Sequence, residues 1–205
     1  MPANFSIVIS GWPAVGKTTI ASALASEFAL KMYNGGDILK MLASERGYPD
    51  ATNRDDWWDT EEAKKFMAER GADSSFDKRV DDRLKDLVRS GGVVITSYTL
   101  PWLVAQGFRA DKPPSIDPII KIWLKGSPKN RAARMANRDR INLAQAIGIV
   151  SLRDNENKKI YKQLYGFDFG ENLEVFDYML NTDVLKLEKL IEISKVIVKN
   201  HAAGL

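Results

Sequence analysis

The sequence predicts a single α/β domain in which helices cover both faces of a parallel sheet, and three observations support this. The chain has 205 residues, enough for one domain with a substantial buried core. Short apolar runs alternate with longer helical stretches, and strands separated by helices usually pair in parallel. A glycine-rich turn joins the first apolar run to the first helical stretch, as in domains that bind phosphate between a strand and a helix.

Residue spacing gives the individual elements. The strands are short runs rich in apolar residues, expected at residues 5–10, 30–33, 91–97, 119–124 and 175–181. The first helix begins near Lys17, where Ile20, Leu24 and Phe28 recur at helical spacing. Further helices are expected at residues 37–47, 60–71, 76–91, 127–140 and 185–200. Residues 109–118 form the clearest loop, and residues 52–60 are expected to be irregular.

The turn at Gly11 carries the strongest functional signal. Residues 11–18 match the pattern Gly-x-x-x-x-Gly-Lys-Thr. Glycine lets successive N–H groups point inward around an anion, and the following helix adds the positive end of its dipole. In this pattern Lys17 reaches the β- and γ-phosphates, and the Thr18 hydroxyl ligates Mg²⁺. The alternative is an ordinary turn, which the flanking strand and helix disfavour. The expected ATP-binding residues are Gly11, Trp12, Pro13, Ala14, Val15, Gly16, Lys17, Thr18 and Thr19.

The composition limits the kinds of binding partner and the cellular compartment that we expect. The net charge is only +3, so we expect no strong positive field that would attract nucleic acid. Cysteine is absent, so disulfides and thiolate metal sites are excluded. No apolar run approaches the length of a membrane span, and no leader is recognised. We therefore expect a cytoplasmic protein that binds small molecules and neither nucleic acid nor membranes, as a monomer, with a dimer as the alternative.

Three classes of phosphate-loop protein compete for this chain. A GTPase requires Asp-x-x-Gly and Asn-Lys-x-Asp segments, and neither occurs. A motor or remodelling ATPase normally ends an apolar strand in acidic residues, whereas the third strand here ends in Thr96-Ser97 and the fourth in Lys125-Gly126. A small-molecule kinase requires a phosphate loop, an acceptor-binding region and an arginine-rich lid. The sequence offers candidates for all three, so it favours the kinase.

The lid candidate is a cluster of arginines late in the chain. Arg131, Arg134 and Arg138 occupy positions i, i+3 and i+7, so one helical face carries all three. Arg153 follows on the next helical segment. Positioned guanidinium groups stabilise the charge that spreads over a transferring phosphoryl group. A solvated basic face is the alternative, but the phosphate loop upstream favours a catalytic lid.

The whole pattern resembles the nucleoside monophosphate kinases, most closely the short archaeal-type cytidylate kinases. The segments that carry the resemblance are ISGWPAVGKTTIASALA, GGDILKMLASERG, RVDDRL, RAARMANRDR, RDNENKKIYKQLYGFD and VFDYMLNT. They span nearly the whole chain. The resemblance implies a three-layer α/β/α fold whose five-stranded parallel sheet has the order 2-3-1-4-5. It also implies an acceptor-binding insert at about residues 37–90 and a lid at about residues 127–165.

The same resemblance assigns roles to individual residues. It implies that Arg134, Arg138 and Arg153 act with Lys17 in catalysis, and that Asp154 orients one of the lid arginines. The residues that it places around the acceptor are Asp37, Lys40, Asp77, Asp81 and Arg83. Ser97 and Tyr98, at the end of the third strand, are added because their hydroxyls offer neutral hydrogen bonds; an ordinary polar turn is the alternative.

Three departures from the family concern the acceptor phosphate. Cytidylate kinases carry Gly-Arg-Leu after the third strand, whereas this chain reads TSYTLPW. Lys40 stands where the family usually has arginine, and a lysine lacks the two-pronged guanidinium. Ile160 replaces the arginine that precedes the tyrosine at Tyr161. These changes reduce the number of cations expected around the acceptor phosphate.

The expected reaction is the Mg²⁺-dependent transfer of a phosphoryl group from ATP to a nucleoside monophosphate, first of all CMP or dCMP. The alternatives are a kinase of another acceptor, such as AMP or a small alcohol, and a nucleotide sensor with residual ATPase activity. Trp57 and Trp58 invite a base-stacking role, but adjacent helical residues point about 100° apart. Hydrophobic packing is therefore the favoured role for this pair.

Overall fold

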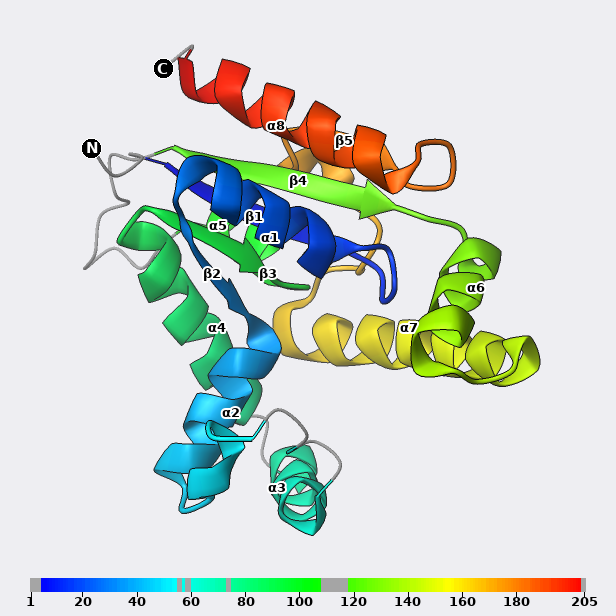
Figure 1. The fold of residues 1–205 in the computed structure, drawn as a ribbon. Helices are drawn as coiled ribbons and strands as arrows, with labels where there is room; N and C mark the ends of the chain where they lie inside the picture. The colour runs from blue at the N-terminus through cyan, green and yellow to red at the C-terminus, as the bar shows by residue number, and fades with distance from the viewer. Residues whose placement is uncertain (1–4, 55–56, 58–59, 73–74, 108–117, 204–205) are drawn as a thin grey trace.

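The structure is a computed structural model that describes residues 5–54, 57, 60–72, 75–107 and 118–203. It contains a parallel sheet of five strands in the order β2-β3-β1-β4-β5, which confirms the predicted fold class. The strands are β1 (Ser6–Gly11), β2 (Lys31–Asn34), β3 (Val93–Thr96), β4 (Ile119–Lys125) and β5 (Tyr178–Asn181). The central strand β1 is buried along its whole length because strands and helices surround it (Figure 1).

Two helical layers cover the sheet. On one face, α1 (Lys17–Phe28) and α8 (Leu187–Ala203) place Leu24 and Val198 against Ile7 and Ile9. On the other face, α4 (Ser75–Arg89) and α5 (Leu100–Ala105) pack with α2 (Gly35–Glu45) against Val8 and Ile95. Figure 1 shows α1 and α8 together on one side and α4 on the other. Among the described residues, no helix is long and apolar enough to cross a bilayer.

Two helical extensions lie beside the carboxyl ends of the strands. The first consists of α2, a 3₁₀ turn at Pro49–Ala51, α3 (Glu61–Ala72) and the start of α4. It has its own small core, in which Trp57 is fully buried against Phe66 and Phe76. The second consists of α6 (Pro128–Asp139) and α7 (Leu143–Tyr165), which runs back beneath the sheet toward α2 (Figure 1).

The observed elements differ from the predicted ones at three places. The helix predicted at residues 127–140 is confirmed as α6, which ends where Arg140 adopts a left-handed conformation (φ 54°). The next helix, α7, for which no bounds were predicted, begins at Leu143 after a capping box at Asn142. The fifth strand begins at Tyr178, since Leu173–Val175 form a 3₁₀ turn (η3). The short helix α5 was not predicted. It begins directly after the end of β3 and packs on α4 and β1.

Candidate active site

The phosphate loop connects β1 to α1 with the geometry that its glycines were expected to give. Gly11 has φ 144°, and a Cβ atom there would overlap the carbonyl oxygen of Leu124 on β4. Gly16 has φ 96° and immediately precedes the first turn of α1. Both positions therefore favour glycine. At Gly11 a side chain would lack space and the backbone angle is unfavourable for other residues, whereas at Gly16 only the backbone angle matters. The loop consequently lies tightly against β4, with the start of α1 directed at it.

Lys17 is folded against this loop. Its Nζ donates hydrogen bonds to the carbonyl oxygens of Gly11 (2.8 Å) and Trp12 (2.9 Å), and it lies 4.5 Å from the ring centroid of Tyr98. Burial is the largest cause that lowers the pKa of Lys17, and the nearby charge of Arg131 lowers it further, to about 7. Asp154 acts in the opposite direction. The ammonium is thus held in a poorly solvated place where added negative charge would stabilise it.

Two cavities open on either side of Lys17. The first, which we call the donor cavity, has a volume of about 840 Å³. It is bounded by the phosphate loop, by arginines of the two lid helices and by the segment after β5. Its lining residues include Ala14–Thr19, Arg134, Arg138, Thr182 and Lys186. A glycine-rich loop, a helix N-terminus and several cations on its walls suit the triphosphate of a nucleotide.

The second cavity, which we call the acceptor cavity, has a volume of about 560 Å³. It lies between the end of β2, α4, the end of β3 and α7. The predicted residues among its walls are Asp77, Asp81, Ser97 and Tyr98. Thr96 and Thr99, whose hydroxyls were also expected to offer hydrogen bonds, line it too. The prediction missed further wall residues, which are Asn34, Gly35, Gly36, Leu39, Val80, Leu84, Glu156, Asn157 and Tyr161.

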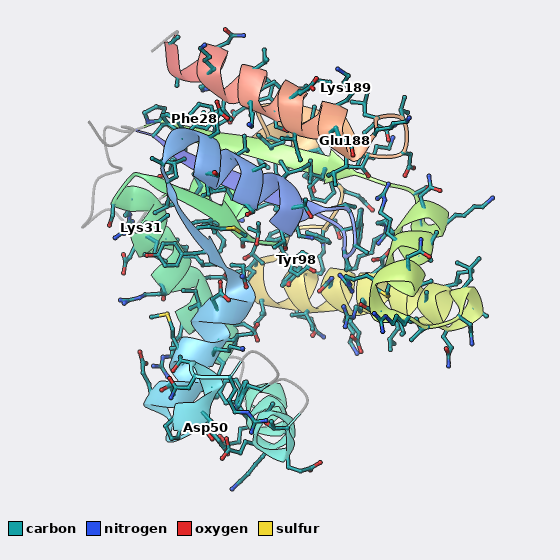
Figure 2. The ribbon with its side chains drawn as sticks, viewed as in Figure 1. Phe28, Lys31, Asp50, Tyr98, Glu188 and Lys189 are labelled. Atoms are coloured by element: carbon teal, nitrogen blue, oxygen red, sulfur yellow. The ribbon has the colours of Figure 1, made fainter. Side chains whose placement is uncertain are left out.

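The two cavities meet at a shared wall. Five residues line both of them, namely Pro13, Lys17, Thr18, Tyr98 and Arg153. Figure 2 shows Tyr98 between the end of the sheet and α7, near the start of α1. A group passed between molecules in the two cavities would cross this wall beside Lys17 and Arg153. The arrangement therefore permits direct transfer between two bound substrates.

The three lid arginines on α6 have different surroundings. Arg131 is only 1% exposed and donates to both carboxylate oxygens of Asp154 on α7, at 2.9 and 2.5 Å. It also donates to the carbonyl oxygens of Pro13 and Gly126. Arg134 contacts Thr182 after β5, whereas Arg138 is largely exposed and pairs with Asp139. Arg131 therefore ties the phosphate loop to both lid helices.

This pairing corrects the role that Asp154 was expected to have. Asp154 was expected to orient one of the lid arginines that face the substrates, but its carboxylate binds the buried Arg131. Arg153, the residue before Asp154 on α7, lines both cavities at the shared wall. Because consecutive residues on a helix point in different directions, Asp154 anchors α7 while Arg153 faces the substrates.

Asp81 is the most deeply buried carboxylate of the acceptor cavity. It is 5% exposed and accepts hydrogen bonds from the hydroxyls of Thr99 (2.5 Å) and Tyr165. Burial is the largest cause that raises the pKa of Asp81, to about 6, against the opposing effect of these two hydrogen bonds. Tyr165 is the last residue of α7, so this bond joins the lid to α4.

Three residues expected around the acceptor do not line the cavity. Asp37 is exposed at the start of α2. The side chain of Asn34 accepts a hydrogen bond from the backbone N–H of Asp37 and donates one to the Asp37 carboxylate. The Nζ of Lys40 reaches the carbonyl oxygen of Arg54 at 2.8 Å. Arg83 lies on the exposed side of α4, because it follows Asp81 by two residues and so points elsewhere on the helix. Contact between these three residues and an acceptor thus stays a prediction without support from this geometry.

The aromatic residues singled out in the sequence mostly pack against other apolar side chains. Trp57 is buried in the small core beside α3, which confirms the packing role expected for it, while Trp58 lies outside the described residues. Tyr161 and Tyr165 both belong to an aromatic cluster with Phe167 and Phe169. In addition, Tyr161 lines the acceptor cavity and Tyr165 bonds Asp81.

The residues at the shared wall fit a magnesium ion that is bound mainly by phosphate. Thr18 is exposed and lines both cavities, so its hydroxyl is available as a ligand. Within the described part of the chain, no group of three or more histidine, cysteine or acidic side chains forms a metal cage. Mg²⁺ commonly binds through one or two protein oxygens together with substrate phosphates and water, and this site matches that mode.

The five-stranded parallel sheet and the glycine-rich loop between β1 and α1 define the phosphate-loop class of α/β fold, and similar solved structures share this fold. A shikimate kinase from Bacteroides thetaiotaomicron superposes with a TM-score of 0.55 and 16% identity over 98% of this chain and 99% of that chain. A gluconokinase from Sinorhizobium meliloti superposes with a TM-score of 0.53 and 16% identity, over 100% of this chain and 97% of that chain. The chain belongs to the cytidylate kinase-like family of nucleotide kinases, whose model matches residues 6–184.

Curated relatives come from archaea and are described as cytidylate kinases. The protein from Staphylothermus marinus is 32% identical over 193 residues, which cover 94% of this chain and 96% of the relative. The protein from Ignicoccus hospitalis is 31% identical over 92% of this chain and 96% of the relative. The resemblance drawn from the sequence motifs is therefore confirmed.

Proposed function

We propose that the chain transfers the γ-phosphoryl group of ATP to a nucleoside monophosphate, with CMP or dCMP as the first candidate acceptor. The observation that carries the proposal is the shared wall, where Lys17, Thr18 and Arg153 face both cavities. The choice of CMP rests on the relatives described as cytidylate kinases, which are about one third identical to this chain. The size of the acceptor cavity, about 560 Å³, is compatible with a nucleotide.

In the proposed reaction each side chain has a limited task. The phosphate loop binds the β- and γ-phosphates of ATP through backbone N–H groups, and Lys17 adds a positive charge. Thr18 would hold Mg²⁺, which when bound would neutralise charge on the phosphates. An oxygen of the acceptor phosphate attacks the γ-phosphorus, the bond to the β,γ-bridging oxygen breaks, and ADP leaves. Arg153 stabilises the charge on the transferring group, while Arg134 and Arg138 hold the donor.

A second acceptor class is favoured by the charge of the acceptor cavity. Among the described wall residues, three are acidic, namely Asp77, Asp81 and Glu156, and the cations are Lys17 and Arg153. Both cations also line the donor cavity. A phosphate dianion would therefore compete with ATP for the same two cations. A hydroxyl compound, which donates hydrogen bonds to carboxylates, would not. A small alcohol is accordingly the second candidate.

An acceptor panel tests both candidates. The purified protein is incubated with Mg-ATP and, separately, CMP, dCMP, UMP, AMP, GMP, cytidine and several polyols, and the products are identified by mass spectrometry. Formation of CDP or dCDP supports the first candidate. Turnover of an alcohol, with the monophosphates inert, replaces it with the second. If every acceptor fails and ATP still binds, the sensor interpretation replaces the kinase. A Lys17→Ala variant controls for contaminating kinases.

The proposal also concerns the oligomeric state of the enzyme and the compartment in which it acts. The described walls of both cavities come from one chain, so a monomer suffices for the reaction. ATP and small nucleotides are available in the cytoplasm, which is where we expect it to act. Light scattering of the active protein tests whether the monomer is active, and a dimer whose separated subunits are inactive would contradict this expectation.

A further inference from the structure

Trp12 was expected among the ATP-binding residues of the phosphate loop, but it is not among the described wall residues of either cavity. Its indole instead packs against Phe169, with ring centroids 4.6 Å apart and ring planes at 77°. This is the edge-to-face arrangement that aromatic pairs prefer. Phe169 is fully buried and follows the end of α7 at Tyr165. Trp12 therefore joins the phosphate loop to the segment that leaves the lid.

The indole of Trp12 is closely surrounded. A Cβ atom added to Gly170 would lie only 2.2 Å from an atom of the indole, so the absence of a side chain at Gly170 makes room for the ring. The guanidinium of Arg131 on α6 lies 5.6 Å from the ring centroid, and the Nζ of Lys158 on α7 lies 5.7 Å from it. Both distances are within the range of a cation–π interaction. Both lid helices and the segment after them thus contact this one side chain.

The phosphate loop needs such support because its backbone shape is not one that the chain prefers. Ala14 has φ 61°, a left-handed conformation that disfavours residues with a side chain. Ordering a loop of this kind costs conformational entropy unless its side chains are anchored. Val15 is 3% exposed and anchors one part of the loop in the main core. Trp12 anchors the part that follows β1.

The backbone at Trp12 also holds groups that face the substrates. Its carbonyl oxygen accepts a hydrogen bond from the Nζ of Lys17 at 2.9 Å. The carbonyl oxygen of the next residue, Pro13, accepts one from Arg131 at 3.3 Å. A shift of Trp12 would therefore move the backbone on which the position of Lys17 depends.

From these contacts we propose that Trp12 is a positioning residue for ATP, whose indole, held by Phe169, keeps the phosphate loop in its binding shape before the nucleotide arrives. The inference rests on the proposed function, because it takes ATP as the ligand of the donor cavity. A loop that is already ordered loses less freedom when its ligand binds, so it binds more tightly. Trp12 thus acts on ATP from behind the loop and without touching it.

The experiment measures the binding of Mg-ATP by isothermal titration calorimetry, with no acceptor present. The proteins are the wild type, Trp12→Leu, Trp12→Phe, Phe169→Leu and the double variant Trp12→Leu/Phe169→Leu. We expect Trp12→Leu to weaken ATP binding by about 2- to 10-fold, the range that corresponds to an aromatic pair. Trp12→Phe should restore most of this loss, because its ring can still meet that of Phe169. The double variant should lose less than the product of the two single losses, because both substitutions break the same contact.

Trp102→Leu is the matched control. Trp102 belongs to the same aromatic cluster, is 3% exposed and has its ring centroid 5.7 Å from that of Phe169. It is not among the described wall residues of either cavity. Its loss should lower the melting temperature at least as much as the loss of Trp12, since it removes a more deeply buried ring. We expect its ATP affinity to stay at the wild-type value.

Three outcomes would overturn the proposal. The first is a Trp12→Leu protein that melts earlier but binds ATP as the wild type does. The second is an equal loss of ATP affinity in Trp102→Leu, which a purely structural role predicts. The third is single losses that multiply in the double variant. Phe169→Met replaces the leucine variant if that variant does not fold, because methionine fills irregular gaps. ATP binding without turnover of any acceptor would contradict the proposed function and leave the role of Trp12 intact.

Discussion

The donor cavity and the acceptor cavity share a wall but are built in different ways. The donor cavity takes much of its lining from one contiguous segment, Ala14–Thr19, and its other charged walls include Arg134, Arg138 and Lys186. The acceptor cavity takes residues from six separate elements, namely α1, β2, α2, α4, β3 and α7, and acidic side chains outnumber basic ones on its described walls. The cations of the donor cavity suit phosphate groups, whereas the carboxylates of the acceptor cavity suit a molecule that donates hydrogen bonds.

This difference shows which half of the site is free to change. A phosphate loop binds through backbone N–H groups and cannot tolerate much variation at Gly11 or Gly16. The acceptor cavity binds through side chains, so substitutions at residues that line it alone, such as Asp77 and Asp81, should alter acceptor binding without disturbing the donor. If this is correct, variants at the shared wall should affect both substrates, and variants behind either cavity should affect one.

The largest effect is expected at Lys17, which belongs to both cavities. Lys17→Ala should abolish phosphoryl transfer while the protein stays folded, because the side chain contacts the loop and the cavities but is not part of the apolar core. Turnover and circular dichroism are measured together, with Lys129→Ala, an exposed lysine on α6, as the control. Undiminished transfer by a folded Lys17→Ala protein would remove the loop from the mechanism.

The buried pair behind the donor cavity is expected to have the next largest effect. Arg131→Met leaves the half-buried Asp154 carboxylate without its partner, which should cost up to about 3–5 kcal/mol of the free energy of unfolding. Urea denaturation checks this. The matched control is Arg138→Met on the same helix, because Arg138 forms an exposed pair with Asp139 that should contribute less than about 1 kcal/mol. Similar losses for the two variants would contradict the anchoring role of Arg131.

The sequence allowed the position of the phosphate loop between a strand and a helix to be predicted, because its signals are local. The glycines of the loop, Lys17 and Thr18 lie within eight residues, and their roles follow from a strand and a helix that adjoin them. The order of the sheet came from the family resemblance, since alternation of strands and helices permits several orders. The end of α6 near residue 140 was predicted, although Arg140 takes up a left-handed conformation there that usually favours glycine.

The acceptor side was predicted less completely because its contacts join distant segments. Asp81 was recognised, but its partner Tyr165 lies 84 residues away and no spacing indicates that bond. Arg131 was placed on one helical face with Arg134, yet its burial depends on Asp154, 23 residues further on. Lys40 has the expected charge, but tertiary structure directs its side chain to the carbonyl oxygen of Arg54.

Arg153 tests whether the shared wall is the place of transfer. Arg153→Ala should lower kcat by at least about 10²-fold with little change in ATP affinity, because positioned arginines stabilise the transferring group more than the bound substrate. Steady-state kinetics and thermal melting are measured together, with Lys159→Ala on the exposed side of α7 as the control. A destabilised protein with nearly normal kcat would show that Arg153 only supports the lid.

The smallest effect concerns the stability contributed by Asp81 and its dependence on pH. Its pKa rises from an ordinary value of 3.8 to about 6 on folding, so between these pH values the folded protein binds more protons than the unfolded chain. Stability from this group is therefore fully present below about pH 4, falls as the pH rises to about 6, and stays low above that. The shift corresponds to at most about 3 kcal/mol.

Asp81→Asn removes this titration while its amide oxygen can still accept a hydrogen bond from Thr99 or Tyr165. We expect the variant to be more stable than the wild-type protein at pH 7.5, by about 1–2 kcal/mol, with the difference shrinking toward pH 4. Its KM for the acceptor should rise while its KM for ATP does not, because Asp81 lines only the acceptor cavity. Urea denaturation across pH and two-substrate kinetics check these expectations, with the exposed Asp82→Asn as the control. A rise in both KM values would mean that the two cavities cannot be altered separately, because the bond from Asp81 to Tyr165 would then be transmitting the change through α7 to the donor side.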